Sequence, residues 1–323
     1  MRILITGAGG FIGSNLVRAL LSAGRLTDKQ GVPRTIERVL LADSYLPTGS
    51  DSRVERLQGD ISDDGVLQRI ADWQPDSVFH LAAVLTSAAA KEPDRALHVN
   101  VSALAQLIGM IGSQTAPPKF IFPSSIAVFG GALPDVVSDN LAQHPQTSYG
   151  THKSIAELML ADATRRGEIE GRSLRLPIVL VHPGPSTSSV SDRVAAIVRD
   201  AVAGRDVTVP LKSETRIPVV SVNAVVAGLI ALHDAPSAKL DGAGAINLPA
   251  LTVSMAGIAA ALGNTVNSSR LGTITFAPDA ALEAIVDSWP KGFVSLTASA
   301  IGISGDDTFE SIVRHYIASL GNA

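Results

Sequence analysis

The stretch that decides the fold is Thr6-Gly7-Ala8-Gly9-Gly10-Phe11-Ile12-Gly13, close to the start of the 323-residue chain. It follows an apolar run that predicts a strand over residues 2–6, and it opens a helical pattern over residues 11–23. A strand, a glycine-rich turn and a helix in this order form the context in which such glycines hold the pyrophosphate of a dinucleotide.

Three glycines in this stretch have distinct physical tasks. Gly7 permits the tight turn, Gly10 leaves space for the backbone to approach a pyrophosphate, and Gly13 lets the helix pack close to the sheet. The helix N-terminus adds unpaired N–H groups and the positive end of its dipole. We therefore expect Gly7, Gly10, Phe11 and Ile12 to contact the cofactor. A plain strand-to-helix turn is the alternative interpretation.

Strands and helices continue to alternate through the first half of the chain. Apolar runs predict further strands at residues 38–43, 54–58, 77–80 and 119–123. Helical patterns are found at residues 63–73, 93–113 and 149–166. Parallel strands joined by right-handed crossover helices build a sheet that is covered on both faces. The predicted fold class is therefore α/β, a doubly wound parallel (Rossmann) sheet with a smaller C-terminal α/β substrate domain.

The alternation loosens after residue 177. We expect residues 1–177 to form the dinucleotide-binding domain. Residues 178–323 should form mainly the substrate-binding domain, with some segments returning to the Rossmann sheet. Helices are predicted there at residues 191–204, 222–233, 252–262 and 278–286, and a polar loop at residues 186–191. Residues 27–35 are polar, contain Gly and Pro, and predict a surface loop in the first crossover.

Composition excludes several classes of protein. Hydrophobic residues make up 46% and charged residues 17%, which is typical of a globular chain rather than a disordered one. The net charge is −4 and there is no dense basic run, so no nucleic-acid partner is expected. The chain has no cysteine, and its seven histidines lack metal-ligand spacing, so no metal is expected. No membrane segment or signal peptide is visible, which predicts a cytoplasmic protein with no membrane contact.

An acidic residue ends the second predicted strand and bears on the choice of cofactor. Asp43 can accept hydrogen bonds from both ribose hydroxyls and would repel a 2′-phosphate, which favours NAD over NADP. It lies further from the glycines than the usual offset of about 20 residues, and the loop at residues 27–35 accounts for the difference. Arg53 and Arg56 are the candidate phosphate partners for NADP, with surface charge as the simpler interpretation.

Asp60 and Ile61 follow the third predicted strand. A carboxylate there can bind the adenine amino group while the isoleucine packs against the ring. Capping of the next helix by Asp60 is an equally good interpretation.

A hydroxyl, a phenol and an amine stand where the sequence predicts the active site. Tyr149 and Lys153 are four residues apart and share one face of a helix. A nearby ammonium should lower the pKa of the phenol, which could then take a proton from an alcohol. Ser125 follows the strand at residues 119–123, and the carboxyl ends of parallel strands face the ligand crevice. Simple turn chemistry is the alternative for Ser125.

Together these motifs resemble the extended short-chain dehydrogenase/reductase family, the NAD-dependent epimerases and dehydratases. The matching segments are residues 6–13, 80–83, Asn100, 124–130 and 149–153. The resemblance implies Ser125, Tyr149 and Lys153 as the catalytic triad, and Tyr149 and Lys153 also as cofactor contacts. The other positions that it implies are the channel wall at Leu81, Ala82 and Ala83, Asn100 behind the cofactor strand, and Pro177 at the start of the nicotinamide-side loop.

The chain also departs from some branches of this family. Ile126 and Ala127 stand where dehydratases carry an Asp-Glu pair, and Phe129 replaces a frequent tyrosine. The absence of cysteine excludes branches that form a thioester. Within the family the chain most resembles the branch that oxidises D-erythronate, partly through residues 183–189. Relatives often form homodimers through the helices at residues 93–113 and 149–166, and a homodimer is expected here.

The residues give a separate reason to expect a small acidic substrate. Residues 181–220 contain no Phe, Tyr or Trp, although a nucleotide-sugar pocket usually needs an aromatic stack. Arg193 and Arg216 lie in or beside this region, and a guanidinium can grip a carboxylate with two hydrogen bonds. Thr86, Ser87 and His182 are further candidates for contact with the substrate. Surface or loop positions without a function are the alternative for each of these residues.

The predicted activity is therefore NAD-dependent oxidation of the C2 hydroxyl of a small sugar acid, a D-erythronate-like aldonate, to the 2-keto acid. Ser125 and Tyr149 would also contact the substrate. Three alternatives stay open: a nucleotide-sugar 4-epimerase with the same triad, an L-threonine-type dehydrogenase, and an NAD-sensing protein without catalysis.

Overall fold

A computed structural model describes residues 1–182, 184, 190–240, 244–267 and 270–321. Its centre is a seven-stranded sheet in the order β13-β9-β7-β6-β1-β4-β5, in which every pair of neighbours is parallel. The strands are β1 (Arg2–Thr6), β4 (Arg38–Asp43), β5 (Val54–Gln58), β6 (Ser77–His80), β7 (Lys119–Ser125), β9 (Glu170–Leu176) and β13 (Ala245–Asn247). The predicted fold class, a doubly wound parallel sheet, is confirmed.

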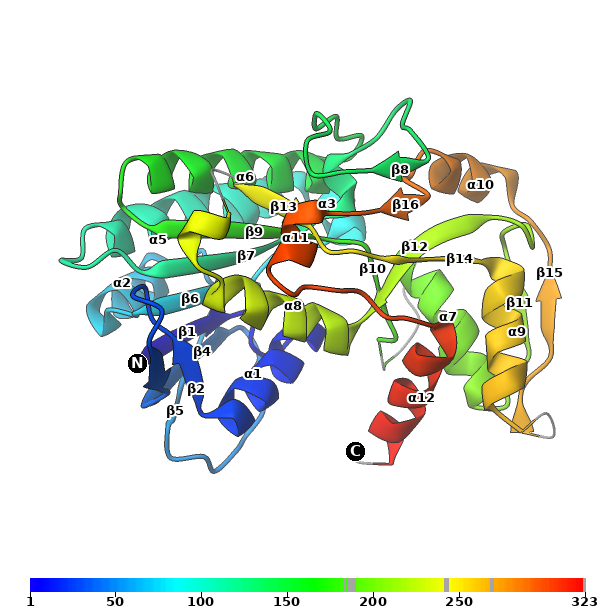
Figure 1. Cartoon of the computed structure of the whole chain (residues 1–323), viewed down its shortest axis with the longest axis horizontal. Helices are drawn as coiled ribbons and strands as arrows, with labels where there is room; N and C mark the ends of the chain where they lie inside the picture. The colour runs from blue at the N-terminus through cyan, green and yellow to red at the C-terminus, as the bar shows by residue number, and fades with distance from the viewer. Residues whose placement is uncertain (183, 185–189, 241–243, 268–269, 322–323) are drawn as a thin grey trace.

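Helices cover both faces of this sheet (Figure 1). One face packs against α1 (Phe11–Ala23) and α8 (Val222–Asp234), and the other against α2 (Asp64–Trp73), α5 (Ala103–Gly112) and α6 (Ser148–Arg165). Side chains of a strand point alternately to the two faces, so Ile3 and Ile5 join the first core and Leu4 joins the second. All three are fully buried, which explains why the strands read as continuous apolar runs.

The expected helix at residues 93–113 is divided into three parts. It consists of α4 (Pro93–Leu97), a π-helical turn at His98–Ser102 and α5, and the short helix α3 (Thr86–Lys91) precedes it. A π-helical turn inserts an extra residue and changes the direction of the side chains it carries. Asn100 lies in this turn and is buried.

A second region contains its own small sheet and its own core. Its strands are β10 (Ile178–Leu180), β12 (Arg216–Ser221) and β14 (Leu251–Ser254), with β11 (Val207–Val209) pairing β15 (Ile274–Phe276). Its helices are α7 (Val190–Val202), α9 (Met255–Thr265), α10 (Ala280–Asp287) and α12 (Phe309–Leu320). Figure 1 shows these helices grouped at the right, beyond the main sheet. The remaining elements are two short strands and a short helix, β8 (Val136–Val137), β16 (Gly292–Phe293) and α11 (Leu296–Ala300). Two short 3-10 turns are found at Ile126–Val128 and Ser237–Lys239.

Two details of the predicted secondary structure are wrong. Residues 27–35 are not simply a loop, because β2 (Arg25–Thr27) and β3 (Pro33–Thr35) pair as an antiparallel hairpin. The helix expected at residues 252–262 begins only at Met255, since Thr252 and Val253 belong to β14 and pair with β12. Both residues are β-branched, which favours a strand. The loop and the branch-specific segment expected within residues 183–191 lie mostly outside the described residues.

The hairpin is anchored by a buried cation at the end of the sheet away from the glycine turn. Lys119 begins β7 and is 3% exposed. Its Nζ donates to the carbonyl oxygens of Thr27 (3.0 Å), Asp28 (3.1 Å) and His233 (2.9 Å). Arg172 donates to the same His233 carbonyl and to those of Leu232 and Ala235 at the C-terminal end of α8. Two cations therefore satisfy the carbonyl groups that a helix leaves unpaired at its end.

Replacing Lys119 should destabilise the protein without reaching the glycine turn. In Lys119→Met, three buried carbonyls lose a charged donor, and we expect the free energy of unfolding to fall by about 2–4 kcal/mol. Urea unfolding followed by circular dichroism measures the change. Lys91→Met, at an exposed lysine, is the control and should leave the midpoint unchanged. Equal midpoints for the two variants would contradict this role of Lys119.

Candidate active site

The glycine turn is packed against the end of β6. Gly7 has a φ of +66°, a conformation that favours glycine, and a Cβ there would lie 2.6 Å from the Ala82 nitrogen. A Cβ on Gly13 would lie 2.1 Å from the Gly7 carbonyl oxygen, so α1 can approach the turn only with glycine at this position. Gly10 is the N-cap of α1, followed by Phe11 and Ile12. This geometry suits a dinucleotide pyrophosphate, and the contacts of Gly7, Gly10, Phe11 and Ile12 with the cofactor stay predictions.

Asp43 lies at the end of β4 and holds the same turn. Its Oδ2 accepts a hydrogen bond from the Gly9 nitrogen at 2.9 Å, and its Oδ1 accepts one from the Tyr45 nitrogen at 3.2 Å. Arg53 is an unsuitable partner for a 2′-phosphate, because its guanidinium bonds Asp51 at 2.7 Å and the Leu21 carbonyl at 2.9 Å. A carboxylate at this position fits NAD better than NADP.

A second wall of the cofactor cradle runs through residues 81–84. The Ala82 nitrogen donates to Thr6 Oγ1 at 3.2 Å, and this hydroxyl is hydrogen bonded to Nδ1 of the buried His80 at 2.9 Å. Burial lowers the pKa of His80 to about 3, with a further contribution from the Lys153 charge, so the ring is neutral. Asn100 accepts from the Val84 nitrogen at 2.8 Å and donates to the Val84 oxygen at 2.9 Å. The π-helical turn thus aims Asn100 at the back of this wall.

The other predicted cofactor contacts lie near the same edge of the sheet. Asp60 accepts from the Ser62 nitrogen at 2.9 Å and from its hydroxyl at 2.7 Å, and Asp63 rather than Asp60 caps α2. Ile61 is 7% exposed and packs in the core beneath α2. Pro177 is buried between β9 and β10. Their contacts with the cofactor stay predictions.

The serine and the tyrosine are brought together by a tight approach of α6 to β7. Thr147 caps the helix by accepting from the Gly150 nitrogen at 3.0 Å. A Cβ on Gly150 would lie 2.0 Å from the Ala127 carbonyl oxygen, so only glycine allows this approach. This approach brings the first turn of α6, which carries Tyr149, against the 3-10 turn that follows Ser125, whose Oγ accepts from the Ala127 nitrogen at 3.1 Å.

The amine of the predicted triad is held beneath the phenol. Lys153 is 5% exposed, and its Nζ donates to the Pro123 carbonyl at 2.7 Å. The same nitrogen lies 4.2 Å from the centre of the Phe122 ring and 5.7 Å from that of Tyr149. Burial lowers the pKa of Lys153 to about 7, and the Glu157 carboxylate opposes that change. The ammonium is therefore close to its titration midpoint at neutral pH.

The expected lowering of the Tyr149 pKa is wrong for the protein alone. Burial raises the pKa of Tyr149 to about 12, and the hydrogen bond with Ser125 only partly opposes the change. The physical reason is that removing a phenolate from water costs more than its surroundings return. Lys153, itself desolvated, carries too little charge near pH 7 to reverse this effect.

Besides Ser125 and Tyr149, five further predicted substrate contacts are spread along the chain. Thr86 and Ser87 begin α3, directly after the cofactor wall. His182 packs the edge of its ring against Phe11 with the centroids 5.0 Å apart, which places it beside the glycine turn. Arg193 is exposed on α7.

Arg216 begins β12, and its guanidinium is 3.7 Å from the Asp135 carboxylate. Both side chains are more than half exposed, so this ion pair is weak. Asp135 lies on the segment that joins Ser125 to Tyr149. Through this ion pair, Arg216 contacts the segment that runs from Ser125 to Tyr149.

A buried acid that sequence reasoning missed lies next to the triad. Glu157 is 4% exposed and follows Lys153 by one helical turn. Its carboxylate pairs with Arg175 of β9, the shortest distance being 2.8 Å. The regular spacing of Tyr149, Lys153 and Glu157 on one helix face was the signal that could have identified it.

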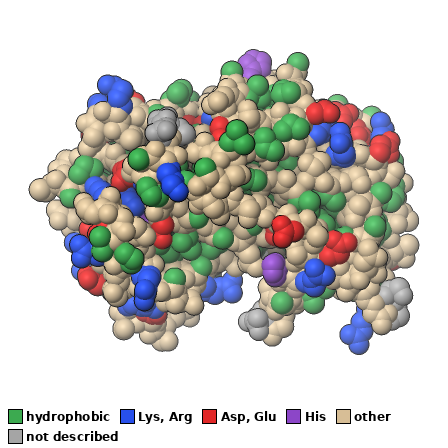
Figure 2. Space-filling view, in the orientation of Figure 1, with side chains coloured by type: hydrophobic (Ala, Val, Ile, Leu, Met, Phe, Trp, Pro, Cys, Tyr) green, Lys and Arg blue, Asp and Glu red, His purple; other side chains and the backbone are tan. Residues whose placement is uncertain are grey.

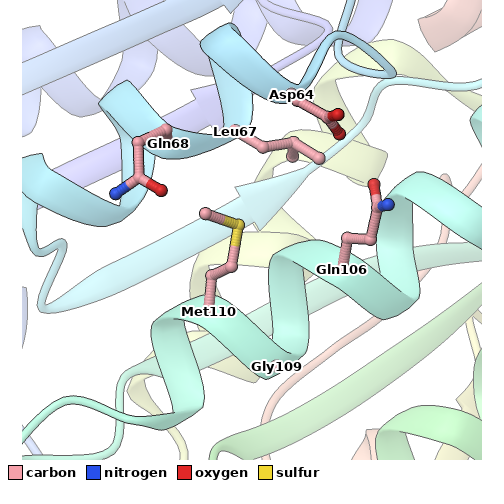
Figure 3. A pocket seen from close by; sticks show the side chains of 6 residues that line it. All are labelled: Asp64, Leu67, Gln68, Gln106, Gly109 and Met110. Carbon is pink, nitrogen blue, oxygen red and sulfur yellow. The ribbon is translucent and has the colours of Figure 1, made fainter.

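A surface hollow elsewhere on the sheet does not mark this site. A cavity of about 420 Å³ lies between α2 and α5, and Figure 3 shows Leu67 and Met110 reaching toward each other from the two helices. No residue of the predicted triad lines it. Figure 2 shows acidic and basic side chains interspersed on the face viewed, in keeping with the small net charge.

Metal ligands and membrane-spanning helices can be assessed for residues 1–182, 184, 190–240, 244–267 and 270–321. Among these residues there is no group of three or more His, Asp or Glu side chains arranged to hold a metal ion. Within the same ranges, no helix combines the length and the apolar character needed to cross a bilayer. Leu97 and Leu158 are exposed on the helices that the homodimer would use, and the homodimer stays a prediction.

Comparisons with known proteins agree with this geometry. The model of the NAD dependent epimerase/dehydratase family matches residues 3–248. A D-erythronate dehydrogenase from Cupriavidus necator is 37% identical over 324 residues, which cover 100% of both chains. The structure of a nucleoside-diphosphate-sugar epimerase from Agrobacterium tumefaciens has a TM-score of 0.92 at 28% identity, covering 100% of this chain and 95% of that one. The holo L-threonine dehydrogenase from Cupriavidus necator has a TM-score of 0.85 at 27% identity, covering 99% and 100%.

The Asp43 carboxylate should control the choice between NAD and NADP. Asp43→Asn keeps an acceptor for the Gly9 nitrogen but removes the charge that repels a 2′-phosphate. We expect the preference for NAD, measured by isothermal titration of both cofactors, to fall about 10- to 100-fold. Asp72→Asn, at an exposed acid on α2, is the matched control. An unchanged ratio of the two dissociation constants would show that Asp43 only supports the turn.

Proposed function

Because the chain belongs to the NAD-dependent epimerase/dehydratase family, we propose that this NAD-dependent oxidoreductase oxidises the C2 hydroxyl of a small sugar acid, a D-erythronate-like aldonate, to the 2-keto acid. The observation that carries the proposal is the position of the buried Lys153 ammonium, which bonds the Pro123 carbonyl of the strand that ends at Ser125 and lies 5.7 Å from the centre of the Tyr149 ring. The full-length similarity to a D-erythronate dehydrogenase supports the substrate class.

In the proposed reaction each side chain has one task. Ser125, at the end of β7, holds the substrate hydroxyl, and Tyr149 accepts the proton of that hydroxyl. Lys153 stabilises the phenolate and holds the ribose of the cofactor. When bound in the glycine cradle, NAD supplies the acceptor for the hydride that leaves C2. One proton and one hydride are thus removed, and a 2-keto acid remains.

The ionisation of Tyr149 is the demanding step. Its raised pKa means that little phenolate exists at neutral pH in the protein alone. The charge on Lys153 becomes more effective when a substrate excludes water from the space between the hydroxyls, since the local dielectric falls. Proton removal is therefore coupled to closure of the site around the substrate.

A carboxylate of the substrate needs a cationic partner, and Arg216 is the residue we propose. Among the residues that the structure describes, its guanidinium pairs weakly with Asp135, and a bidentate carboxylate can replace that partner. Arg193, Thr86, Ser87 and His182 are proposed to contact the remaining groups of the substrate. The absence of aromatic residues at 181–220 disfavours a nucleotide-sugar substrate.

A substrate panel tests the proposed activity. NADH formation should be seen with four- to six-carbon aldonates and should be at least tenfold slower with L-threonine or a nucleotide sugar. Tyr149→Phe should lower kcat about 100-fold or more, because the proton acceptor is lost. Circular dichroism and NAD titration check that this variant is folded and binds cofactor. Turnover near the original rate in Tyr149→Phe would disprove the mechanism.

Arg216 should act on binding rather than on the chemical step. In Arg216→Met the KM for aldonates should rise about 10- to 100-fold with little change in kcat, since a charge-assisted bond to the carboxylate is lost. Arg216→Lys keeps the charge without the bidentate geometry. Its KM for aldonates should lie between those of the original protein and of Arg216→Met. Arg193→Met tests the second arginine in the same assay. An unchanged KM in Arg216→Met would exclude this residue from the carboxylate site.

A further inference from the structure

Glu157 is the centre of a buried polar network next to the active site. Its carboxylate accepts from Arg175 Nε at 3.0 Å and from Nη2 at 2.8 Å. It also accepts hydrogen bonds from the Ser124 hydroxyl and from the side-chain amide of Gln143. These partners come from β9, from β7 and from the segment between Ser125 and Tyr149. One carboxylate therefore joins three parts of the chain that border the two hydroxyl groups.

The network continues toward the region that contains β8 and β16. Arg175 Nη1 donates to the Asp139 carbonyl at 2.9 Å. The Asp139 carboxylate accepts from the Asn247 nitrogen and from the Ser295 hydroxyl, each at 2.7 Å. Asn247 ends β13 and Ser295 caps α11. The polar contacts thus extend from α6, the helix that carries Lys153, through Asp139 to the end of β13 and the start of α11.

Stability alone does not explain an ion pair at this depth. Glu157 and Arg175 are 4% and 5% exposed, and taking two charges out of water costs about as much as their attraction returns. In proteins generally, replacing a buried ion pair by apolar side chains of similar volume is often neutral or stabilising. The charge of Glu157 has another visible effect, because it favours the protonated form of Lys153 against the effect of burial.

We infer that Glu157 is a positioning residue of the active site, which holds Ser124 at the end of β7 and Gln143 on the segment leading to Tyr149, and which acts on Lys153 from one helical turn away. This inference rests on the proposed function for its catalytic consequence, whereas its electrostatic part concerns the protein alone. The groups facing Lys153 are Tyr149 and Glu157 on its own helix and His80 from β6, and His80 is neutral. Within the described ranges, Glu157 is the carboxylate that raises the pKa of Lys153 against burial.

Direct titration of Lys153 tests the electrostatic part. The Nζ and Cε signals of Lys153, assigned with Lys153→Met, are followed by heteronuclear NMR against pH. The midpoint of the original protein should lie at about 7. In Glu157→Gln it should fall by about half a unit to one unit, because the favourable charge is gone. This measurement needs neither substrate nor cofactor, so it stays informative even if the proposed substrate class is wrong.

The pH dependence of kcat tests the catalytic part. A less charged Lys153 stabilises the Tyr149 phenolate less, so the acidic limb of the kcat profile should move to higher pH in Glu157→Gln. At pH 7 this shift should lower kcat about three- to tenfold, while the KM for the aldonate changes little. A purely structural role would instead reduce kcat equally at all pH values.

Two further variants separate charge from hydrogen bonding and from misfolding. Ser124→Ala removes a hydrogen bond to Glu157 but keeps the charge of its carboxylate. The midpoint of the Lys153 titration and the midpoint of the acidic limb of the kcat profile should therefore equal those of the original protein. Glu157→Gln can leave Arg175 buried without a counter-charge, and Glu157→Gln/Arg175→Gln keeps the network neutral in case the single variant fails to fold. The double variant should show the same downward shift of the Lys153 midpoint. An unchanged midpoint in a folded Glu157 variant would overturn the inference.

Discussion

The burial of one ammonium group constrains the whole site. Lys153 must be reached by the Pro123 carbonyl, must lie beneath the Tyr149 ring and must be shielded from water. These conditions fix the distance between α6 and the end of β7, which is why the first turn of the helix carries Gly150 against the Ala127 carbonyl. They also place the pKa of Lys153 near neutrality, where a small change in neighbouring charge has its largest effect on the charged fraction.

The same burial works against the phenol that Lys153 supports. Desolvation disfavours the charged form of each group, the ammonium of Lys153 and the phenolate of Tyr149. It therefore weakens the pair of charges that the proposed catalysis needs. Tyr149 and Lys153 are therefore not a ready base and its helper in the protein alone. Additional charge must hold Lys153 in its protonated form, and the buried Glu157 supplies it from the next helical turn. The cost of burying Glu157 is in turn offset by Arg175 of β9, so catalytic electrostatics and sheet architecture are coupled.

Sequence reasoning succeeded where the signal was local. The glycine turn, the parallel strands and α1 follow from apolar runs bounded by glycine and charge. It failed where a distant partner decides the outcome. Thr252 and Val253 join a strand only because β12 offers an edge, and residues 27–35 form a hairpin supported by Lys119 from another element. The pairing of Glu157 with Arg175 could not be read from the chain, because two separate elements must first bring them together.

The division into separate cores explains how one catalytic arrangement can serve different substrates. The glycine turn, Asp43 and Lys153 all depend on the two cores that flank the seven-stranded sheet. Arg193 and Arg216 belong to α7 and β12, whose apolar residues contribute largely to a third core. Substitutions in that third core can therefore reshape the substrate side while the phenol and ammonium stay in place. The Asp139 network crosses between these regions, so changes that move Asp139 would be felt at both the substrate and the proton-transfer groups.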